Sequence, residues 1–128
     1  MTATSIDAER DYDDKRFSAV ELCRTDRQKT VCGYFEPGQF IPVHAPDSDV
    51  VITVLSGSGL VREGDTDHGV EPGSVVAVEA DTDRGIKADD DSRLEAVLVT
   101  APPPTDGEHD PVRRGLKHDA FEPPETEQ

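Results

Sequence analysis

The sequence GQFIPVHAPDSDVVITVLSG, residues 38–57, contains a glycine turn, a single histidine, a short acidic loop and an apolar segment in direct succession. Residues 50–55 form an unbroken apolar run rich in β-branched side chains, which predicts a β-strand. His44 lies between Pro42 and Pro46. Because proline cannot donate to a strand ladder, this segment is expected at a barrel rim or a sheet edge. The histidine is therefore expected at the mouth of the core that the strand lines.

Short apolar segments continue on both sides of this stretch, and turns rich in Gly or Pro separate them. Turn signals recur about every eight to twelve residues with no sustained helical period, which is typical of antiparallel sandwiches and barrels. We predict an all-β protein, an antiparallel jelly-roll barrel of about eight to ten strands. The further segments predicted as strands are residues 16–24, 29–36, 60–62, 74–78, 84–88 and 93–101.

A chain of 128 residues is long enough for one domain with a single core. The barrel is predicted over residues 16–101. Residues 1–15 are polar and acidic with a single Ile6 and are predicted to form a mobile arm. Residues 102–128 are predicted to be a proline-rich spacer, a short helix and an acidic tail.

The short C-terminal helix is expected to begin at Asp110-Pro111, because proline is favoured at the first helical position. It carries Arg113, Arg114 and Lys117, a basic cluster in an acidic sequence. Two interpretations stay open. The helix either latches onto an acidic patch of its own barrel or of a partner subunit, or forms a frayed turn at the surface.

The charge of the chain excludes some partners. Asp and Glu number 28 against 13 Lys and Arg, which gives a formal net charge of −15. Such a charge repels nucleic acids and anionic membrane surfaces. Acidic runs and an excess of Arg over Lys are typical of the cytoplasm of a salt-accumulating, haloarchaeal-type organism. No apolar run reaches the roughly 18 residues that span a bilayer, so we expect a cytoplasmic protein with neither membrane nor nucleic-acid partners.

The two cysteines, Cys23 and Cys32, are too few for a zinc cluster. They would face each other if residues 21–24 and 30–34 formed a hairpin that turns near Arg27 and Gln28. The alternative is two small thiols in a reduced compartment.

The spacing in the quoted stretch resembles the first motif of the cupin family. That motif is a Gly, a His after five residues, a second His two further on, a Glu three or four residues later, and a closing Gly. Here Gly38, His44 and Gly57 keep the frame, whereas Pro46 and Val50 stand at the second His and the Glu.

The second cupin motif supplies a further metal-binding His. In this chain the motif falls on Gly73, Glu79, Asp81, Arg84 and Ala88, and Arg84 stands where the His is expected. The resemblance spans residues 33–101 and implies a jelly-roll barrel. Of the four metal ligands that the family uses, it leaves only His44.

The resemblance also implies a poor metal site, because a guanidinium does not bind divalent cations. We therefore expect no resident iron, manganese or zinc and no other cofactor. If a divalent metal is bound, His44 with Asp47 or Asp49 is the expected ligand set. Glu79 or Asp83 are the acidic alternatives from the second motif.

Strand alternation places the remaining site residues. If position 50 points inward, as the Glu of the family does, Val50, Ile52 and Val54 line the barrel and positions 51, 53 and 55 face outward. The outer face is still apolar, and a sheet that is apolar on both sides needs a second cover. We therefore expect a homodimer packed sheet to sheet.

Arg84 requires a counter-charge, because a buried guanidinium without one costs several kcal/mol. One interpretation is an internal salt bridge with Glu36, Glu79 or Glu95. The other is that the counter-charge is a ligand, a carboxylate or phosphate held by Arg84 with a second hydrogen bond from His44.

These observations predict a metal-poor binding or sensing module for a small molecule, and the expected ligand is an anion with an apolar body. The alternative, implied by the resemblance, is a metal-dependent enzyme such as an oxygenase or a sugar isomerase with a rearranged site. A purely structural or partner-binding barrel is a third interpretation, and whether the protein is an enzyme stays open. The predicted ligand-binding residues are His44, Arg84, Val50, Ile52, Val54 and Ile86.

Overall fold

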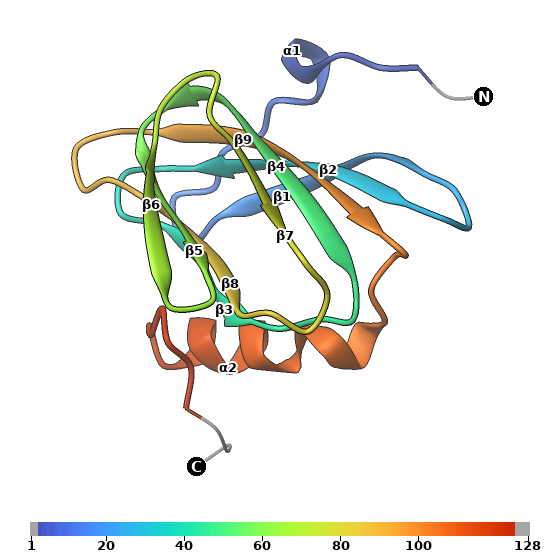
Figure 1. Cartoon of the computed structure of the whole chain (residues 1–128). Helices are drawn as coiled ribbons and strands as arrows, with labels where there is room; N and C mark the ends of the chain where they lie inside the picture. The colour runs from blue at the N-terminus through green and yellow to red at the C-terminus, as the bar shows by residue number, and fades with distance from the viewer. Residues whose placement is uncertain (1–2, 125–128) are drawn as a thin grey trace.

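A computed structural model of the chain describes residues 3–124 (Figure 1). Within these residues nine strands form two antiparallel sheets, one with the order β1-β2-β9-β4-β7 and one with the order β3-β8-β5-β6. The two sheets enclose the core, which confirms the predicted all-β jelly roll. The strands are β1 (Ser18–Arg24), β2 (Lys29–Phe35), β3 (Phe40–His44), β4 (Asp49–Gly57), β5 (Gly59–Glu63), β6 (Thr66–Val70), β7 (Val75–Val78), β8 (Arg84–Ala88) and β9 (Leu94–Ala101).

Strand β4 shows how the sequence pattern builds the core. Val50, Ile52 and Val54 point into the barrel and are buried, whereas Val51 and Leu55 are exposed on the outer face. Each buried aliphatic side chain of this kind stabilises the fold by about 1.5–3 kcal/mol relative to an exposed one. The predicted alternation of this strand is confirmed.

Strand β3 lies at the edge of the four-stranded sheet, as its prolines predicted, and pairs only with β8. Its register shifts between Ile41 and His44, and the shift brings His44 directly opposite Arg84. The two residues singled out in the cupin-like motifs are therefore cross-strand neighbours at one end of the barrel.

The C-terminal segment covers this edge. It contains a 3₁₀ helix η1 (Asp106–His109) and the helix α2 (Asp110–Lys117), which has proline in its first turn as predicted. Figure 1 shows α2 lying across the end of the barrel beside β3. The approach is close, since a Cβ on Gly115 would lie 2.4 Å from the Pro42 side chain.

Two residues of the basic cluster of α2, Arg113 and Arg114, bind within the C-terminal segment itself. Arg113 forms ion pairs with Asp106 and Asp110, and the Arg114 Nε donates to the Pro124 carbonyl. These pairs are not the contact with an acidic patch of the barrel that one of the two open interpretations expects. The reason is local, because the acidic residues nearest to Arg113 lie in the first turns of its own segment.

The start of the expected acidic tail is packed against the barrel. Phe121 meets Phe40 edge to face at 5.9 Å, and its carbonyl accepts a 2.8 Å hydrogen bond from the Val43 N–H. Gly85 provides the space, since a Cβ there would lie 2.8 Å from the Phe121 ring. The rest of the predicted tail, residues 125–128, lies outside the described residues.

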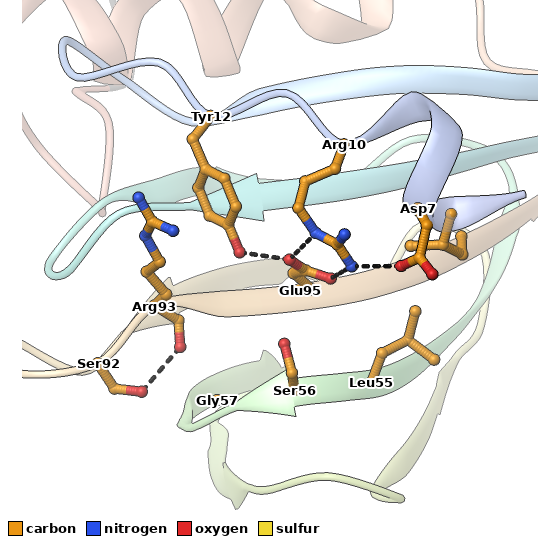
Figure 2. A pocket seen from close by; sticks show the side chains of 10 residues that line it. Asp7, Arg10, Tyr12, Leu55, Ser56, Gly57, Ser92, Arg93 and Glu95 are labelled. Atoms are coloured by element: carbon orange, nitrogen blue, oxygen red, sulfur yellow. Dashed lines mark hydrogen bonds and ion pairs between the residues drawn. The ribbon is translucent and has the colours of Figure 1, made fainter.

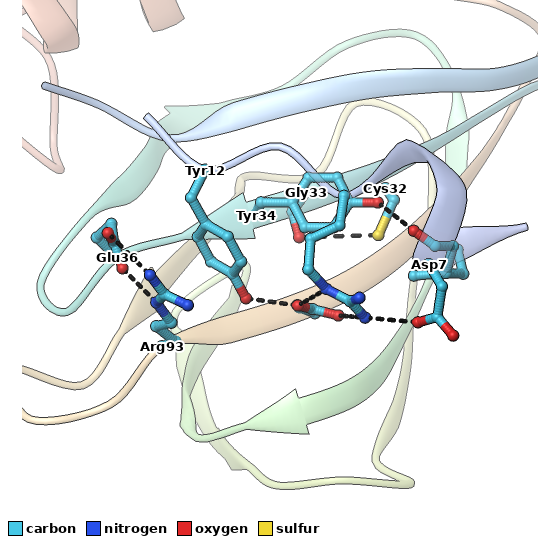
Figure 3. A network of polar contacts seen from close by, with 10 residues as sticks. Asp7, Tyr12, Cys32, Gly33, Tyr34, Glu36 and Arg93 are labelled. Carbon is cyan, nitrogen blue, oxygen red and sulfur yellow. Dashed lines mark hydrogen bonds and ion pairs between the residues drawn. The ribbon is translucent and has the colours of Figure 1, made fainter. Parts of the chain in front are cut away.

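Residues 3–15 of the segment predicted as a mobile arm contact the barrel. The segment forms a short helix α1 (Ile6–Glu9), and the two residues Arg10 and Tyr12 both bind Glu95 of β9 (Figure 2). Figure 3 shows Tyr12 of this network beside the ion pair of Glu36 and Arg93. The distances to the Glu95 carboxylate are 2.7 Å from Arg10 Nε and 2.6 Å from the Tyr12 hydroxyl. The physical reason is that Glu95 is only 5% exposed and needs these partners.

The two cysteines are free thiols and do not face each other. The predicted hairpin is present, but Cys23 pairs with Thr30 and Cys32 pairs with Val20. The position of the turn is the reason: the Thr25 N–H donates to the Gln28 carbonyl, so Arg24 lies opposite Lys29 and Cys23 opposite Thr30. A β-bulge between Glu21 and Cys23 shifts the register once more before Val20 and Cys32.

The closing glycine of the first motif has a steric role that yields a stability prediction. Gly57 has a φ of 80°, and a Cβ there would lie 1.7 Å from the Arg93 carbonyl oxygen. Gly57→Ala should therefore lower the free energy of unfolding by at least about 2 kcal/mol, because both a left-handed backbone and a clash are imposed. Chemical denaturation measures the change.

Gly69→Ala in β6 is the matched control, since nothing lies within 4 Å of its added Cβ and its φ is not positive. This variant should lose much less stability. Equal losses in the two variants would refute the steric role of Gly57.

Candidate functional site

A cavity of about 450 Å³ opens between the two sheets and is closed on one side by η1 and α2. Its walls are apolar side chains from both sheets, among them Val31, Val50, Ile52, Ile86 and Leu98. The C-terminal segment adds Pro104, Val112 and Leu116. The cavity is therefore formed jointly by the barrel and the segment that follows it.

The cavity contains five of the six residues predicted for the site: His44, Arg84, Val50, Ile52 and Ile86. The sixth, Val54, is buried in the core but does not line the cavity. It lies one inward position beyond Ile52, opposite Ala96 of β9, where the two sheets are filled by side chains.

Arg84 is the first residue of β8 and is only 5% exposed. Its Nη2 donates to the Glu79 carbonyl at 2.8 Å, and its Nε lies 3.4 Å from the Thr82 carbonyl. Within residues 3–124, its Nη1 is buried without a hydrogen-bond partner, and no carboxylate forms an ion pair with it. A buried donor left in this state costs about 1–3 kcal/mol, and more on a charged group.

The three glutamates considered as partners of Arg84 are engaged elsewhere. Glu36 pairs with Arg93, and Glu95 pairs with Arg10 on the outer face of the five-stranded sheet. Glu79 contributes only its main-chain carbonyl. The interpretation of Arg84 as half of an internal salt bridge is therefore wrong for all three.

The carboxylates nearest to Arg84 bind backbone amides instead. Asp49 accepts a hydrogen bond from the Ala80 N–H at 2.9 Å. Glu108 accepts from the N–H of both Asp47 and Thr105 and so holds η1 to the β3–β4 loop. Burial lowers the pKa of Arg84, and the negative charges of Asp49, Asp81 and Glu108 oppose that shift without contact.

His44 is the second polar group of the site. Its Nδ1 lies 2.9 Å from the Pro42 carbonyl, which can only accept, so Nδ1 carries the proton. Desolvation is the main cause that lowers the pKa of His44 to about 4. The hydrogen bond to Pro42 opposes this shift, whereas the charges of His109 and Arg84 add to it. His44 is therefore neutral at pH 7.

The sequence did not indicate four titratable residues as part of the cavity wall: Arg16, Lys29, His109 and Arg113. Lys29 begins β2 and alternates with the inward-facing Val31, so the strand pattern contained a signal for it. His109 and Arg113 lie in the C-terminal segment, and the sequence left open whether this segment packs against the barrel.

The charges that line the cavity all have one sign. Arg16, Lys29, Arg84 and Arg113 contribute to the wall, and no Asp or Glu of the described residues does so. The protein as a whole has 28 acidic residues against 13 basic ones. The cavity therefore has the opposite electrostatic character to the rest of the molecule.

The described residues do not fit a metal centre. The predicted set of His44 with Asp47 or Asp49 is not assembled, because Asp49 binds the Ala80 amide and Asp47 is exposed. No group of three or more His, Cys, Asp or Glu within residues 3–124 is arranged to hold a metal ion.

A second hollow, of about 570 Å³, lies on the outer face beside the N-terminal segment (Figure 2). Its polar side chains bind one another: Glu95 binds Arg10 and Tyr12, and Arg10 also binds Asp7. Arg93 stacks on the Tyr12 ring at 4.1 Å. Because these groups already have partners, this hollow offers a ligand less than the inner cavity does.

The lowered pKa of His44 predicts a pH-dependent stability. Between pH 6.5 and about 4 the unfolded state binds a proton at this residue and the folded state does not. Stability should therefore fall as pH falls through this window. His44→Asn keeps a donor for the Pro42 carbonyl but has no group that titrates in this window. Its free energy of unfolding should therefore fall by about 2 kcal/mol less than that of the wild type. Urea unfolding at a series of pH values measures both curves, and parallel curves would contradict the assignment.

Several solved structures share this fold. The protein TT1209 from Thermus thermophilus has a TM-score of 0.78 and 25% identity, over 81% of this chain and 100% of its own. An RmlC-like cupin from Desulfovibrio desulfuricans has a TM-score of 0.71 and 27% identity, over 80% and 98%. KdgF from a Halomonas species has a TM-score of 0.67 and 20% identity, over 77% and 93%.

A comparison with curated proteins finds no match. The two α-helices within residues 3–124 are too short and too polar to span a membrane. The family model described as a cupin domain matches residues 33–100, more than half of the chain. This match, the two facing sheets and the retained Gly38, His44 and Gly57 agree, and the chain belongs to the cupin domain family.

Proposed function

We propose that this cupin is a binding or sensing module for a small organic anion with an apolar body. The proposal rests on the Nη1 of Arg84, which is buried without a hydrogen-bond partner among residues 3–124. It lies beside a cavity whose charged side chains are all basic. A carboxylate or phosphate at this position would supply the missing acceptor and the missing counter-charge together.

The cavity favours an anion with an apolar portion. A guanidinium binds carboxylate or phosphate oxygens in a fork, and such charge-assisted hydrogen bonds are roughly twice as strong as neutral ones. His44 lies opposite Arg84. Because its proton is on Nδ1 and bound to the Pro42 carbonyl, its Nε2 can only accept, so His44 would contact a hydroxyl or another donor of the ligand and not the anionic group itself. The aliphatic walls around them would exclude water from the rest of the ligand.

A metal-dependent oxygenase or sugar isomerase, the alternative implied by the family, lacks support from the described side chains. Such a site needs several ligands in fixed geometry. Of the four ligand positions in the two motifs, this chain keeps only His44, because the second His, the Glu and the third His are replaced. The nearby carboxylates bind backbone amides.

We propose a salt-rich cytoplasm as the setting in which this protein works. A net charge of −15 would oppose the approach of an anion to the cavity. At molar salt, charges are screened over about 3 Å, against about 30 Å at 10 mM, so the long-range repulsion disappears. The contact at Arg84 is buried and would be screened much less.

We also propose a homodimer that packs through the outer face of the five-stranded sheet. The exposed large hydrophobic residues of this face are Val51, Leu55, Val75 and Val99, and Val75 is 62% exposed. They come from the neighbouring strands β4, β7 and β9. An apolar patch shared by adjacent strands is typical of a protein interface.

The dimer is tested by sedimentation at molar KCl. Wild type is expected to sediment as a dimer at high micromolar concentration. Val75→Asp should shift it to a monomer, because a charge replaces the most exposed side chain of the apolar patch. Thr66→Asp, on the exposed edge strand β6, is the matched control and should stay dimeric. A monomeric wild type would remove the proposal.

Anion binding is tested by thermal shift at molar KCl with a panel of organic acids and sugar phosphates. At least one compound should raise the melting temperature of the wild type, and Arg84→Met should abolish the rise. The variant without ligand should be at least as stable as the wild type, because it removes a buried charge that has no counter-charge.

Arg24→Met is the matched control, since Arg24 is exposed and paired only with its neighbour Glu21. It should respond to ligand as the wild type does. If no compound of the panel stabilises the wild type, or if Arg84→Met responds equally, anion binding at this site is refuted.

A further inference from the structure

We infer that the cavity binds a ligand with two anionic ends joined by an apolar middle, such as a linear dicarboxylate, with one end at Arg84 and the other at Lys29. This inference rests on the proposed function and specifies its ligand class. It follows from the position of Lys29 relative to Arg84, from the residues between them, and from the absence of a carboxylate partner for either among the described residues.

The first step is the position of Lys29 on the inner face. Lys29 of β2 lies opposite Thr100 of β9, and Thr100 lies opposite Val50 of β4. All three line the cavity, so they form one row across the inner face of the five-stranded sheet. Arg84 lies on β8 in the other sheet. Because packed sheets are about 10 Å apart, the two cations stand on opposite walls of the cavity.

The second step is the path between these two cations. His44 is directly opposite Arg84 in the strand register, and its ring centre lies 6.2 Å from that of His109. His109 lines the same cavity as Lys29. Burial is the main cause that lowers the pKa of His109, and the charges of Lys29 and Arg113 add to this shift. The polar groups of the cavity therefore run in the order Arg84, His44, His109, Lys29.

The third step separates Lys29 from the other basic residues of the wall. Arg113 is already neutralised by Asp106 and Asp110. Arg16 is exposed and lies two residues before β1, where it also borders the neighbouring surface hollow. Lys29 is half-buried and forms no ion pair with a carboxylate of residues 3–124. Among the basic residues of the wall other than Arg84, Lys29 is therefore the one expected to bind a second anionic group.

The fourth step is the character of the wall between the two ends. Val31, Leu98, Val50 and Ile52 of one sheet face Ile86 of the other. These side chains offer no hydrogen bonds, so polar groups of a linker that face them would lose their water without compensation, and hydrogen bonds are available only on the side of His44, His109 and Thr100. A chain of methylene groups or an apolar ring would instead be stabilised by burial.

The experiment compares linear dicarboxylates from succinate to sebacate with monocarboxylates of the same chain length, by titration calorimetry at molar KCl. For the wild type, affinity should peak at one intermediate chain length. At that length the dicarboxylate should bind at least about tenfold more tightly than its monocarboxylate, a difference of about 1.4 kcal/mol.

Three variants test which residue binds each anionic end of the ligand. Lys29→Met should remove the advantage of the dicarboxylate and leave the affinity for the monocarboxylate unchanged. Arg84→Met should abolish binding of both. Arg113→Met is the matched control, because Arg113 also lines the cavity but is already paired, and it should keep the preference for the dicarboxylate.

The failure of this inference differs from the failure of the proposed function. If both ligand series bind equally and only Arg84→Met abolishes binding, the proposed function stands and the second anionic end is refuted. A preference for dicarboxylates that persists in Lys29→Met also refutes the role of Lys29. If neither series binds the wild type, the inference is refuted for carboxylates of this class.

Discussion

The alternation of side chains along β4 and β9 is the constraint on which the rest of this structure depends. In β9, Leu94 and Ala96 point into the core, so Glu95 between them must point outward. This placement separates Glu95 from Arg84 by the thickness of a sheet. The carboxylate is then satisfied by Arg10 and Tyr12 of the N-terminal segment, while the guanidinium stays without a carboxylate partner among the described residues.

The acidic residues around the barrel mouth accept hydrogen bonds from backbone amides. They do not neutralise Arg84 or Lys29 of the cavity. Asp49 fixes the loop before β8 through the Ala80 amide, and Glu108 ties η1 to the β3–β4 loop through the Asp47 amide. A carboxylate that accepts hydrogen bonds from backbone N–H groups is stabilised in its charged form. These carboxylates therefore position the loops around the cavity but do not line it. In this way an acidic protein can contain a cavity whose charged side chains are basic.

The fold could be predicted from local patterns because turns and alternation depend on neighbouring residues. The apolar run of β4, the prolines around His44 and the closing Gly57 were sufficient to place the barrel and its edge strand. The site was predicted in part, since His44 and Arg84 were located through their spacing. Lys29, His109 and the partners of Glu95 were missed, because they depend on how distant segments pack against the barrel.

The packing of the C-terminal segment also bears on the solubility of the barrel. The edge strand β3 presents backbone groups that could pair with a strand of another molecule, and such exposed edges promote aggregation. Here α2 lies along β3, and the amide of Val43 is already bonded to the Phe121 carbonyl. Pro42 removes a further donor from the same edge. The segment that closes the cavity thus also shields this edge from intermolecular strand addition.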